Sequence, residues 1–153
     1  MWVWFVSITI VVFFTVIIFI PKHMSWLEIY TTTWFALSFE FILNILLSLK
    51  FDLYGYFSKG VDLEGFIVIL GLYPTYNVIF LNFFPKSNRW KQTLYILGHS
   101  LFVTCYEYAI LHTEAFYYNG WKLWYSALCY PVIFLVLYWN LLITRWLFAR
   151  AQH

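Results

Sequence analysis

The chain has 153 residues, of which 63% are hydrophobic and only 10% are charged. An ordinary soluble domain has about 25% charged residues, so the composition excludes a protein whose whole surface faces water. A net charge of +2 gives no reason to expect nucleic acid as a partner. We therefore expect an integral membrane protein whose main partner is the lipid bilayer.

Five long apolar runs, taken in chain order, predict five transmembrane helices. Unpaired backbone groups are costly in lipid, so each run should be helical, and about 20 residues cross about 30 Å of hydrocarbon. The first run lacks the charged start and the cleavage site of a signal peptide, so we expect it to be retained. The predicted fold is all-α, a polytopic bundle forming one integral membrane domain over 1–153. Its helices are expected at 2–20, 28–49, 66–84, 93–112 and 124–144.

The basic residues between the expected helices predict the orientation. If the chain crosses the membrane five times, the larger group of Lys and Arg residues lies on the side of the C-terminus: Lys22, Lys86, Arg89, Lys91, Arg145 and Arg150. The opposite side carries Lys50, Lys59 and Lys122. The side richer in Lys and Arg is usually cytoplasmic. We therefore expect the N-terminus outside and the C-terminus inside.

Two carboxylic acids fall inside expected spans. Glu40 lies near the midpoint of 28–49, and Glu107 lies in the outer half of 93–112. A charged side chain at the centre of a bilayer costs on the order of 3 kcal/mol on insertion scales. Each carboxyl group should therefore be protonated, paired or in contact with a watery cavity, and both are candidates for function.

Further polar residues lie at helical spacing from these two acids or on neighbouring expected helices. Asn44 follows Glu40 by four residues and shares its helical face. If the polar stripes of neighbouring helices converge, they form a pocket that opens to the outer face. The candidate members are Glu40, Asn44, Asn77, Glu107, Ser126 and Tyr130. For the Asn and Ser residues a structural role is the alternative, because such side chains often hydrogen-bond between packed helices.

The segment 113–123 is aromatic and contains a turn signal. Asn119 and Gly120 favour a turn with positive φ, which would bring the neighbouring aromatic residues back to the membrane interface. Trp121 would then anchor the turn at the level of the lipid headgroups. A lid over the outer pocket is the alternative function of this turn.

Motifs of known chemistry are absent from the sequence. It has no signature of serine hydrolases, zinc proteases, P-loop proteins or dinucleotide-binding proteins. Cys105 and Cys129 lie in apolar runs and form neither a metal-ligand spacing nor a disulfide framework. We therefore predict no metal and no cofactor.

Three segments resemble a known group of proteins: YPTYNVIFLNFFP at 73–85, LYILGHSLFVTCYEY at 94–108 and YNGWKLWYSALCYP at 118–131. They are similar to a small, uncharacterised family of multi-pass membrane proteins from Bacillus-like and clostridial bacteria, and the resemblance covers roughly 28–146. It implies a bacterial cytoplasmic membrane and no particular activity. The positions that match the family pattern are Glu107, Gly120, Trp121, Tyr125 and Ser126.

Three functions are open at this point. Short loops and the lack of a catalytic motif favour a non-enzymatic accessory or lipid-binding component of a membrane complex, with a membrane-protein partner or a second copy of itself. A proton- or cation-coupled transport component would use Glu40 and Glu107. A membrane-embedded enzyme acting on a lipid headgroup would use Glu107 as acid or base, assisted by His112 or Tyr130.

Overall fold

The computed structural model of the chain describes residues 2–57, 63–86, 88–113 and 115–151. The predicted all-helical class is confirmed, with a short β-ribbon that the sequence did not predict. The helices are α1 (Trp2–Phe19), α2 (Trp26–Leu43), a π-helical segment η1 (Asn44–Lys50), α3 (Leu63–Asn82), α4 (Arg89–Leu111) and α5 (Leu123–Ala151). The ribbon consists of strands β1 (Tyr54–Tyr56) and β2 (Phe116–Tyr118), which pair antiparallel.

Four helical segments in the described part of the chain are long and apolar enough to cross a membrane. They are Trp26–Lys50, Leu63–Asn82, Arg89–Leu111 and Leu123–Ala151, whereas the part of α1 with described side chains, Trp4–Phe19, is apolar but shorter. Their outer faces expose large apolar side chains, including Trp34, Leu101 and Val132. Such a surface suits lipid and not water.

Several helix ends differ from the expected positions: α3 begins at Leu63 and α4 at Arg89, each a few residues early, and the largest difference is at the end of α5. The fifth helix was expected to end near residue 144, but α5 continues to Ala151. Hydropathy marks where a helix leaves the apolar layer, and a helix can continue past that point on charged residues such as Arg145. The helix expected at 28–49 is α-helical only to Leu43, after which η1 completes it.

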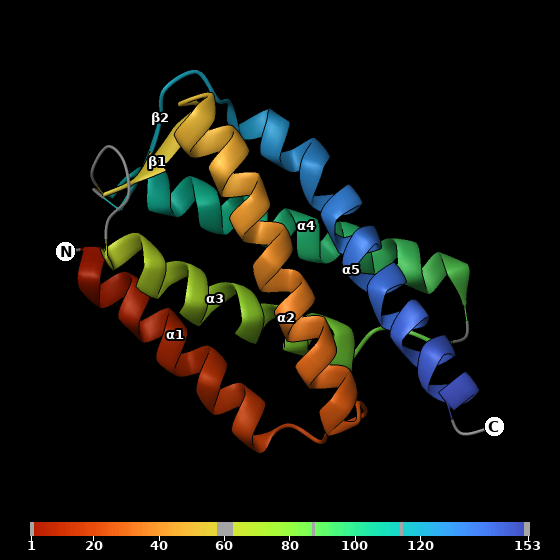
Figure 1. Cartoon of the computed structure of the whole chain (residues 1–153). Helices are drawn as coiled ribbons and strands as arrows, with labels where there is room; N and C mark the ends of the chain where they lie inside the picture. Colours follow the sequence, from red (N-terminus) through yellow and green to blue (C-terminus); the bar gives the residue numbers. More distant parts are fainter. Residues whose placement is uncertain (1, 58–62, 87, 114, 152–153) are drawn as a thin grey trace.

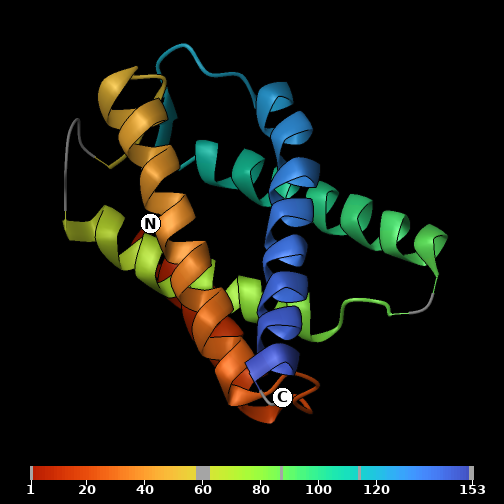
Figure 2. The same cartoon turned by 45° about the vertical axis from the view of Figure 1, so that its right-hand side comes forward.

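The helices form a bundle in which α2 occupies a central place. It packs against α3 and α5, while α1 packs against α3 and α4 against α5 (Figure 1). In Figure 2, α2 and α5 stand next to each other, and α3 and α4 cross behind them. The ribbon and the turn before α5, residues 51–57 and 115–122, form one end of the bundle, here called the ribbon end. Residues 20–25 and 83–86 lie at the other end, here called the loop end.

The best-packed part of the core lies toward the loop end. Phe80 is fully buried there and its ring centroid lies 4.4 Å from that of Phe134. The Phe84 ring stacks on Tyr138 with 3.9 Å between centroids. The cluster is mostly aromatic, and such rings gain from both burial and ring geometry. A smaller apolar cluster, which includes Leu72, lies toward the ribbon end.

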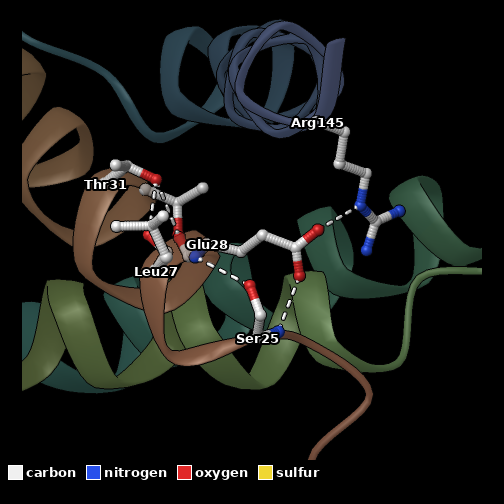
Figure 3. A network of polar contacts seen from close by, with 6 residues as sticks. Ser25, Leu27, Glu28, Thr31 and Arg145 are labelled. Carbon is white, nitrogen blue, oxygen red and sulfur yellow. Dashed lines mark hydrogen bonds and ion pairs between the residues drawn. The ribbon is translucent and has the colours of Figure 1, made fainter. Parts of the chain in front are cut away.

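An ion pair ties the start of α2 to the last part of α5 (Figure 3). Nε of Arg145 donates to Oε1 of Glu28 at 2.6 Å. The other carboxylate oxygen accepts from the backbone N–H of Ser25 at 2.7 Å, and the Ser25 hydroxyl accepts from the N–H of Glu28. This reciprocal capping box fixes where α2 begins. One side chain therefore both caps α2 and holds α5 against it.

Close packing of α1 on α3 predicts the effect of two glycine substitutions. A Cβ at Gly71 of α3 would lie 2.9 Å from Cδ1 of Ile10, whereas a Cβ at Gly98 of α4 would meet nothing within 4 Å. Gly71→Leu should therefore separate α1 from α3 and destabilise the protein by about 1–3 kcal/mol. Thermal unfolding in a mild detergent, followed by circular dichroism, measures the effect.

Gly98→Leu is the matched control, because it places the same side chain in a helix without a neighbour. Leu has a higher helix propensity than Gly, so this variant should unfold at or above the wild-type temperature. Equal unfolding temperatures for the two variants would show that α1 does not pack on Gly71.

Candidate functional site

The carboxylate of Glu107 lies inside the bundle and is surrounded by hydroxyl groups. The residue is 8% exposed. Its Oε1 accepts hydrogen bonds from the hydroxyls of Tyr118, at 2.5 Å, and Ser126, at 2.8 Å. Its Oε2 accepts from the hydroxyl of Tyr130 at 2.6 Å. Ser126 and Tyr130 follow each other by one turn of α5, so one face of that helix supplies two of the three donors.

Trp121 supports the hydroxyl groups around Glu107 through a hydrogen bond to Ser126. Its indole Nε1–H donates to the Ser126 hydroxyl oxygen at 2.8 Å. A hydroxyl group has one proton to donate and lone pairs to accept. Because the indole supplies a donor to the oxygen, the Ser126 proton is directed to Glu107. Trp121 therefore orients the hydroxyl without touching the carboxylate.

The turn predicted at residues 119–121 places this indole. The backbone N–H groups of Asn119 and Trp121 both donate to the carbonyl oxygen of Leu53, at 2.8 and 3.0 Å. Gly120, between them, has a φ of 135°, a region that residues with a Cβ rarely adopt. The Asn119 side chain also donates to Asp52 at 2.8 Å. The turn thus closes around the residue that precedes β1.

Glu40 lies at a second group of polar side chains. Its Oε1 accepts from Nδ2 of Asn44 at 2.7 Å, and the Tyr73 hydroxyl is a further hydrogen-bond partner of the carboxylate. The Tyr54 hydroxyl donates to Oδ1 of Asn44 at 3.3 Å. The hydroxyls of Tyr56 and Tyr73 lie 2.9 Å apart. Residues of α2, η1, β1 and α3 therefore meet around this second carboxylate.

Both carboxylates line one cavity of about 170 Å³. Of the six predicted pocket residues, four line it: Glu40, Asn77, Glu107 and Tyr130. Asn44 and Ser126 stand behind the carboxylates as hydrogen-bond donors. The rest of the wall is mostly apolar and aromatic, and it includes Phe39, Leu72, Phe102, Phe116 and Ile133. The structure thus brings together residues of every helix and both strands.

The cavity ends on the aromatic core of the loop end. Phe134 and Leu137 belong both to the cavity wall and to the buried core cluster. Phe80 packs directly against Phe134 on the far side. At the other end, Ala115 and Phe116 of the ribbon end form part of the wall. The cavity therefore occupies the half of the bundle nearer the ribbon.

Asn77 contributes a buried amide to the cavity wall. The residue is 2% exposed, and its Nδ2 donates to the backbone oxygen of Thr32 at 3.3 Å. Its Oδ1 has no hydrogen-bond partner among the described residues. Buried polar atoms in native proteins are nearly always paired. Protein atoms enclose this oxygen, so the amide contributes to the cavity wall through its other atoms.

The ribbon tyrosines remain protonated donors. Burial raises the pKa of the Tyr118 phenol above its usual range, and its hydrogen bond to Glu107 raises it further. Burial also raises the pKa of Tyr56, and the charges of Glu40 and Glu107 add to this effect. Tyr56 thus lies within electrostatic range of both carboxylates.

Several residues of the site were missed by sequence reasoning. Tyr54, Tyr56 and Tyr118 lie on strands of three residues each, which are too short for an alternating pattern to be recognised. The available signal was the aromatic content of the two segments, Tyr-Gly-Tyr at 54–56 and Phe-Tyr-Tyr at 116–118. Trp121 was expected as an interface anchor, and its bond to Ser126 was not foreseen.

No family model, curated protein or solved structure matches this chain. The resemblance to membrane proteins of Bacillus-like and clostridial bacteria therefore stays a prediction. Within the described residues, the fold and the cavity define a helical protein with four helices apolar enough to cross a membrane and an internal cavity that carries two carboxylates.

The bond between Tyr118 and Glu107 predicts the effect of removing one hydroxyl from β2. Tyr118→Phe deletes a donor to a buried carboxylate and should destabilise the protein by about 1.5–3 kcal/mol. Tyr117→Phe is the matched control, because no hydrogen bond of its hydroxyl is found among the described residues, and it should change stability by less than about 0.5 kcal/mol. Unfolding by titration with SDS, followed by circular dichroism, measures both. Equal stabilities would mean that Tyr118 does not hold the carboxylate.

Proposed function

We propose that this protein is a non-enzymatic membrane protein that binds a lipid or another small amphipathic molecule in the cavity. It would serve as an accessory or lipid-binding component of a membrane complex, with another membrane protein or a second copy of itself as partner. The observation that carries the proposal is the cavity itself, whose mainly apolar wall contains two hydrogen-bonded carboxylates.

The wall has the composition of a binding site for a molecule with an apolar body. Such sites are lined mainly by apolar and aromatic side chains, with a few polar groups that fix orientation. An empty apolar space also lacks dispersion contacts that a well-packed interior would make. A bound apolar group would make those contacts, and the two carboxylates would supply the orienting groups.

The arrangement around Glu107 favours binding over catalysis. Both oxygens of this carboxylate accept hydrogen bonds from side chains of the protein itself. A general acid or base must exchange a proton with its substrate at hydrogen-bond distance, and here three hydroxyl groups of the protein already lie at that distance from the carboxylate. Three hydroxyl donors instead hold the carboxylate in one position, which suits a fixed part of a binding wall.

We further propose that the chain forms one domain over 1–153 with five spans in a bacterial cytoplasmic membrane, N-terminus outside and C-terminus inside. The 18 residues of α1 extend about 27 Å, so a modest thinning of the bilayer allows this helix to span. His23, Lys86 and Arg145 lie around one hollow at the loop end. This concentration of basic side chains supports a cytoplasmic loop end.

The orientation is tested by a fusion at the C-terminus. A fluorescent protein that matures only in the cytoplasm, fused after His153, should fluoresce in bacterial cells. The same reporter fused in the 113–123 segment at the ribbon end should stay dark at equal expression. Fluorescence of the second fusion alone would reverse the orientation.

Proton- or cation-coupled transport is the second candidate. The observation in its favour is that Glu40 and Glu107 line the same cavity, because intramembrane carboxylates often mark ion pathways. The cavity ends on the aromatic core, so a transport cycle would require a second conformation that opens the loop end. Flux in liposomes that disappears with Glu40→Gln would favour transport over binding alone.

Filling the cavity provides the direct test of the proposed function. Val103→Trp adds a large ring to the cavity wall, whereas Leu101→Trp places the same ring on the exposed face of α4. Mass spectrometry of protein purified in mild detergent should detect a stoichiometric lipid or other amphiphile on the wild type and on Leu101→Trp. The signal should fall at least tenfold with Val103→Trp. Equal amounts on all three proteins would place the bound molecule outside the cavity and contradict the proposal.

A further inference from the structure

The loop end contains a hollow that is separate from the cavity of the two carboxylates. It measures about 230 Å³, and it lies where the end of α3 and the last part of α5 meet the loop before α2. None of its described lining residues also lines the cavity. Three of them are basic, namely His23, Lys86 and Arg145, and none of those described is acidic. Such a lining favours a ligand with negative charge.

The charged donors of the hollow have hydrogen bonds left to give. The guanidinium of Arg145 uses its Nε–H for Glu28 (Figure 3), and no hydrogen bond of its two terminal nitrogens is found among the described residues. Those nitrogens are also absent from the buried atoms without a partner, so protein atoms do not enclose them. Lys86 is exposed and likewise has no partner among the described residues. The planar fork of an arginine matches the oxygens of a phosphate group.

Tyr138 adds a neutral donor to the same hollow. Its ring stacks on Phe84 with 3.9 Å between centroids, which fixes the position of the side chain. No hydrogen bond of its hydroxyl is found among the described residues, and its oxygen is not enclosed by protein atoms. The hollow therefore offers hydrogen bonds from three kinds of side chain, two of them charged.

The elements around the hollow are held together before any ligand binds. Nδ2 of Asn82, at the end of α3, donates to the backbone oxygen of Pro21 at 2.9 Å. Its Oδ1 accepts from the backbone N–H of His23 at 2.8 Å. One side chain thus joins the loop before α2 to α3, while Glu28 holds Arg145 in place. Groups that are already positioned lose less freedom when a ligand binds.

The charges around the hollow suit a ligand with one negative charge. Glu28 compensates one of the two positive charges of Arg145 and Lys86, which leaves one without a counter-charge. The carbonyl end of α3 opposes an anion with about half an elementary charge. This is less than the remaining positive charge, so the hollow still attracts an anion. A phosphodiester group carries the single negative charge required.

The surroundings of the hollow favour a phosphate that belongs to a lipid. The hollow lies near the ends of two helices that are long and apolar enough to cross a membrane, which is where lipid headgroups lie. Leu142 lines it and is 42% exposed on the outer face of α5. Polar donors and a lipid-facing surface therefore adjoin at this point. A cavity of about 150 Å³ in another protein accommodates benzene, so a phosphate group, which has fewer heavy atoms, has room here.

We propose that the hollow at the loop end binds the phosphate group of a phospholipid with a net negative charge, whose acyl chains lie along the exposed apolar face of α5. Arg145, Lys86 and Tyr138 would donate to the phosphate oxygens. A zwitterionic lipid is disfavoured, because its ammonium group would find no acid among the described lining residues. The site is distinct from the cavity and does not depend on the function proposed for it.

Three compounds on the full-length protein in a non-ionic detergent, at constant ionic strength, test the ligand. They are dihexanoyl phosphatidylglycerol, dihexanoyl phosphatidylcholine and inorganic phosphate. A ligand of the folded state raises the unfolding temperature, and phosphatidylglycerol should do so at a concentration about tenfold lower than either of the others. Equal potency of phosphatidylcholine would overturn the preference for a negative lipid. Equal potency of inorganic phosphate would overturn the lipid as the source, and no rise with any compound would overturn the site.

A first matched pair of variants distinguishes the hollow from general attraction between charges. Lys86→Gln and Lys91→Gln each remove one positive charge, but Lys91 does not line the hollow. Only Lys86→Gln should raise the phosphatidylglycerol concentration required, by about tenfold. Equal responses would show that the lipid is attracted by the net charge of the loop end and would contradict the proposed site. Arg145 is left unchanged, because it also holds α5 against α2.

A second pair tests the hydroxyl without any change of charge. Tyr138→Phe keeps the ring that stacks on Phe84 and should raise the phosphatidylglycerol concentration required by about threefold. Tyr30→Phe removes an exposed hydroxyl outside the hollow and should leave the concentration unchanged. Both variants should unfold at the wild-type temperature without lipid, since neither hydroxyl has a partner among the described residues. Equal lipid responses of the two would show that Tyr138 does not contact the phosphate.

Discussion

A carboxylate inside a bundle of apolar helices must have hydrogen-bond donors, and the ribbon end is built around this constraint. An uncompensated charge in such surroundings is among the most costly features that a protein can contain. Glu107 meets the requirement with donors from two elements, Tyr118 of β2 and Ser126 with Tyr130 of α5. The turn that carries Trp121 orients one of them. The position of the ribbon on the bundle therefore depends on this side chain.

The same ribbon also reaches the second carboxylate. Tyr54 and Tyr118 are directly paired across the two strands. One of them bonds to Asn44, which holds Glu40, and the other bonds to Glu107. Each strand thus sends one tyrosine toward one carboxylate. The two acids are held by partners around the cavity and still line it, and a displacement of the ribbon would disturb both together.

The sequence predicted the contacts between residues close together in the chain and missed those between residues far apart. Glu40 with Asn44, and Ser126 with Tyr130, are separated by one helical turn, so periodicity alone places each pair on one face. The helices themselves follow from apolar runs of sufficient length. The contribution of Tyr118 depends on strand pairing between segments about sixty residues apart, and no local pattern encodes such pairing. For the same reason the sequence could not show that Glu107 and Glu40 line one cavity.

The two halves of the bundle differ in packing: the interior is closely packed toward the loop end, and the ribbon end contains the cavity. Toward the loop end, Phe80 and its aromatic neighbours fill the interior, and the Glu28–Arg145 ion pair joins α2 to α5. Toward the ribbon end, the interior contains a cavity whose wall includes charged groups. Close packing stabilises a protein, and a cavity lowers that stability because its lining has fewer packing contacts. A protein retains such a wall at the expense of stability when another molecule occupies it, so the contrast between the halves is itself an argument for a ligand at the ribbon end.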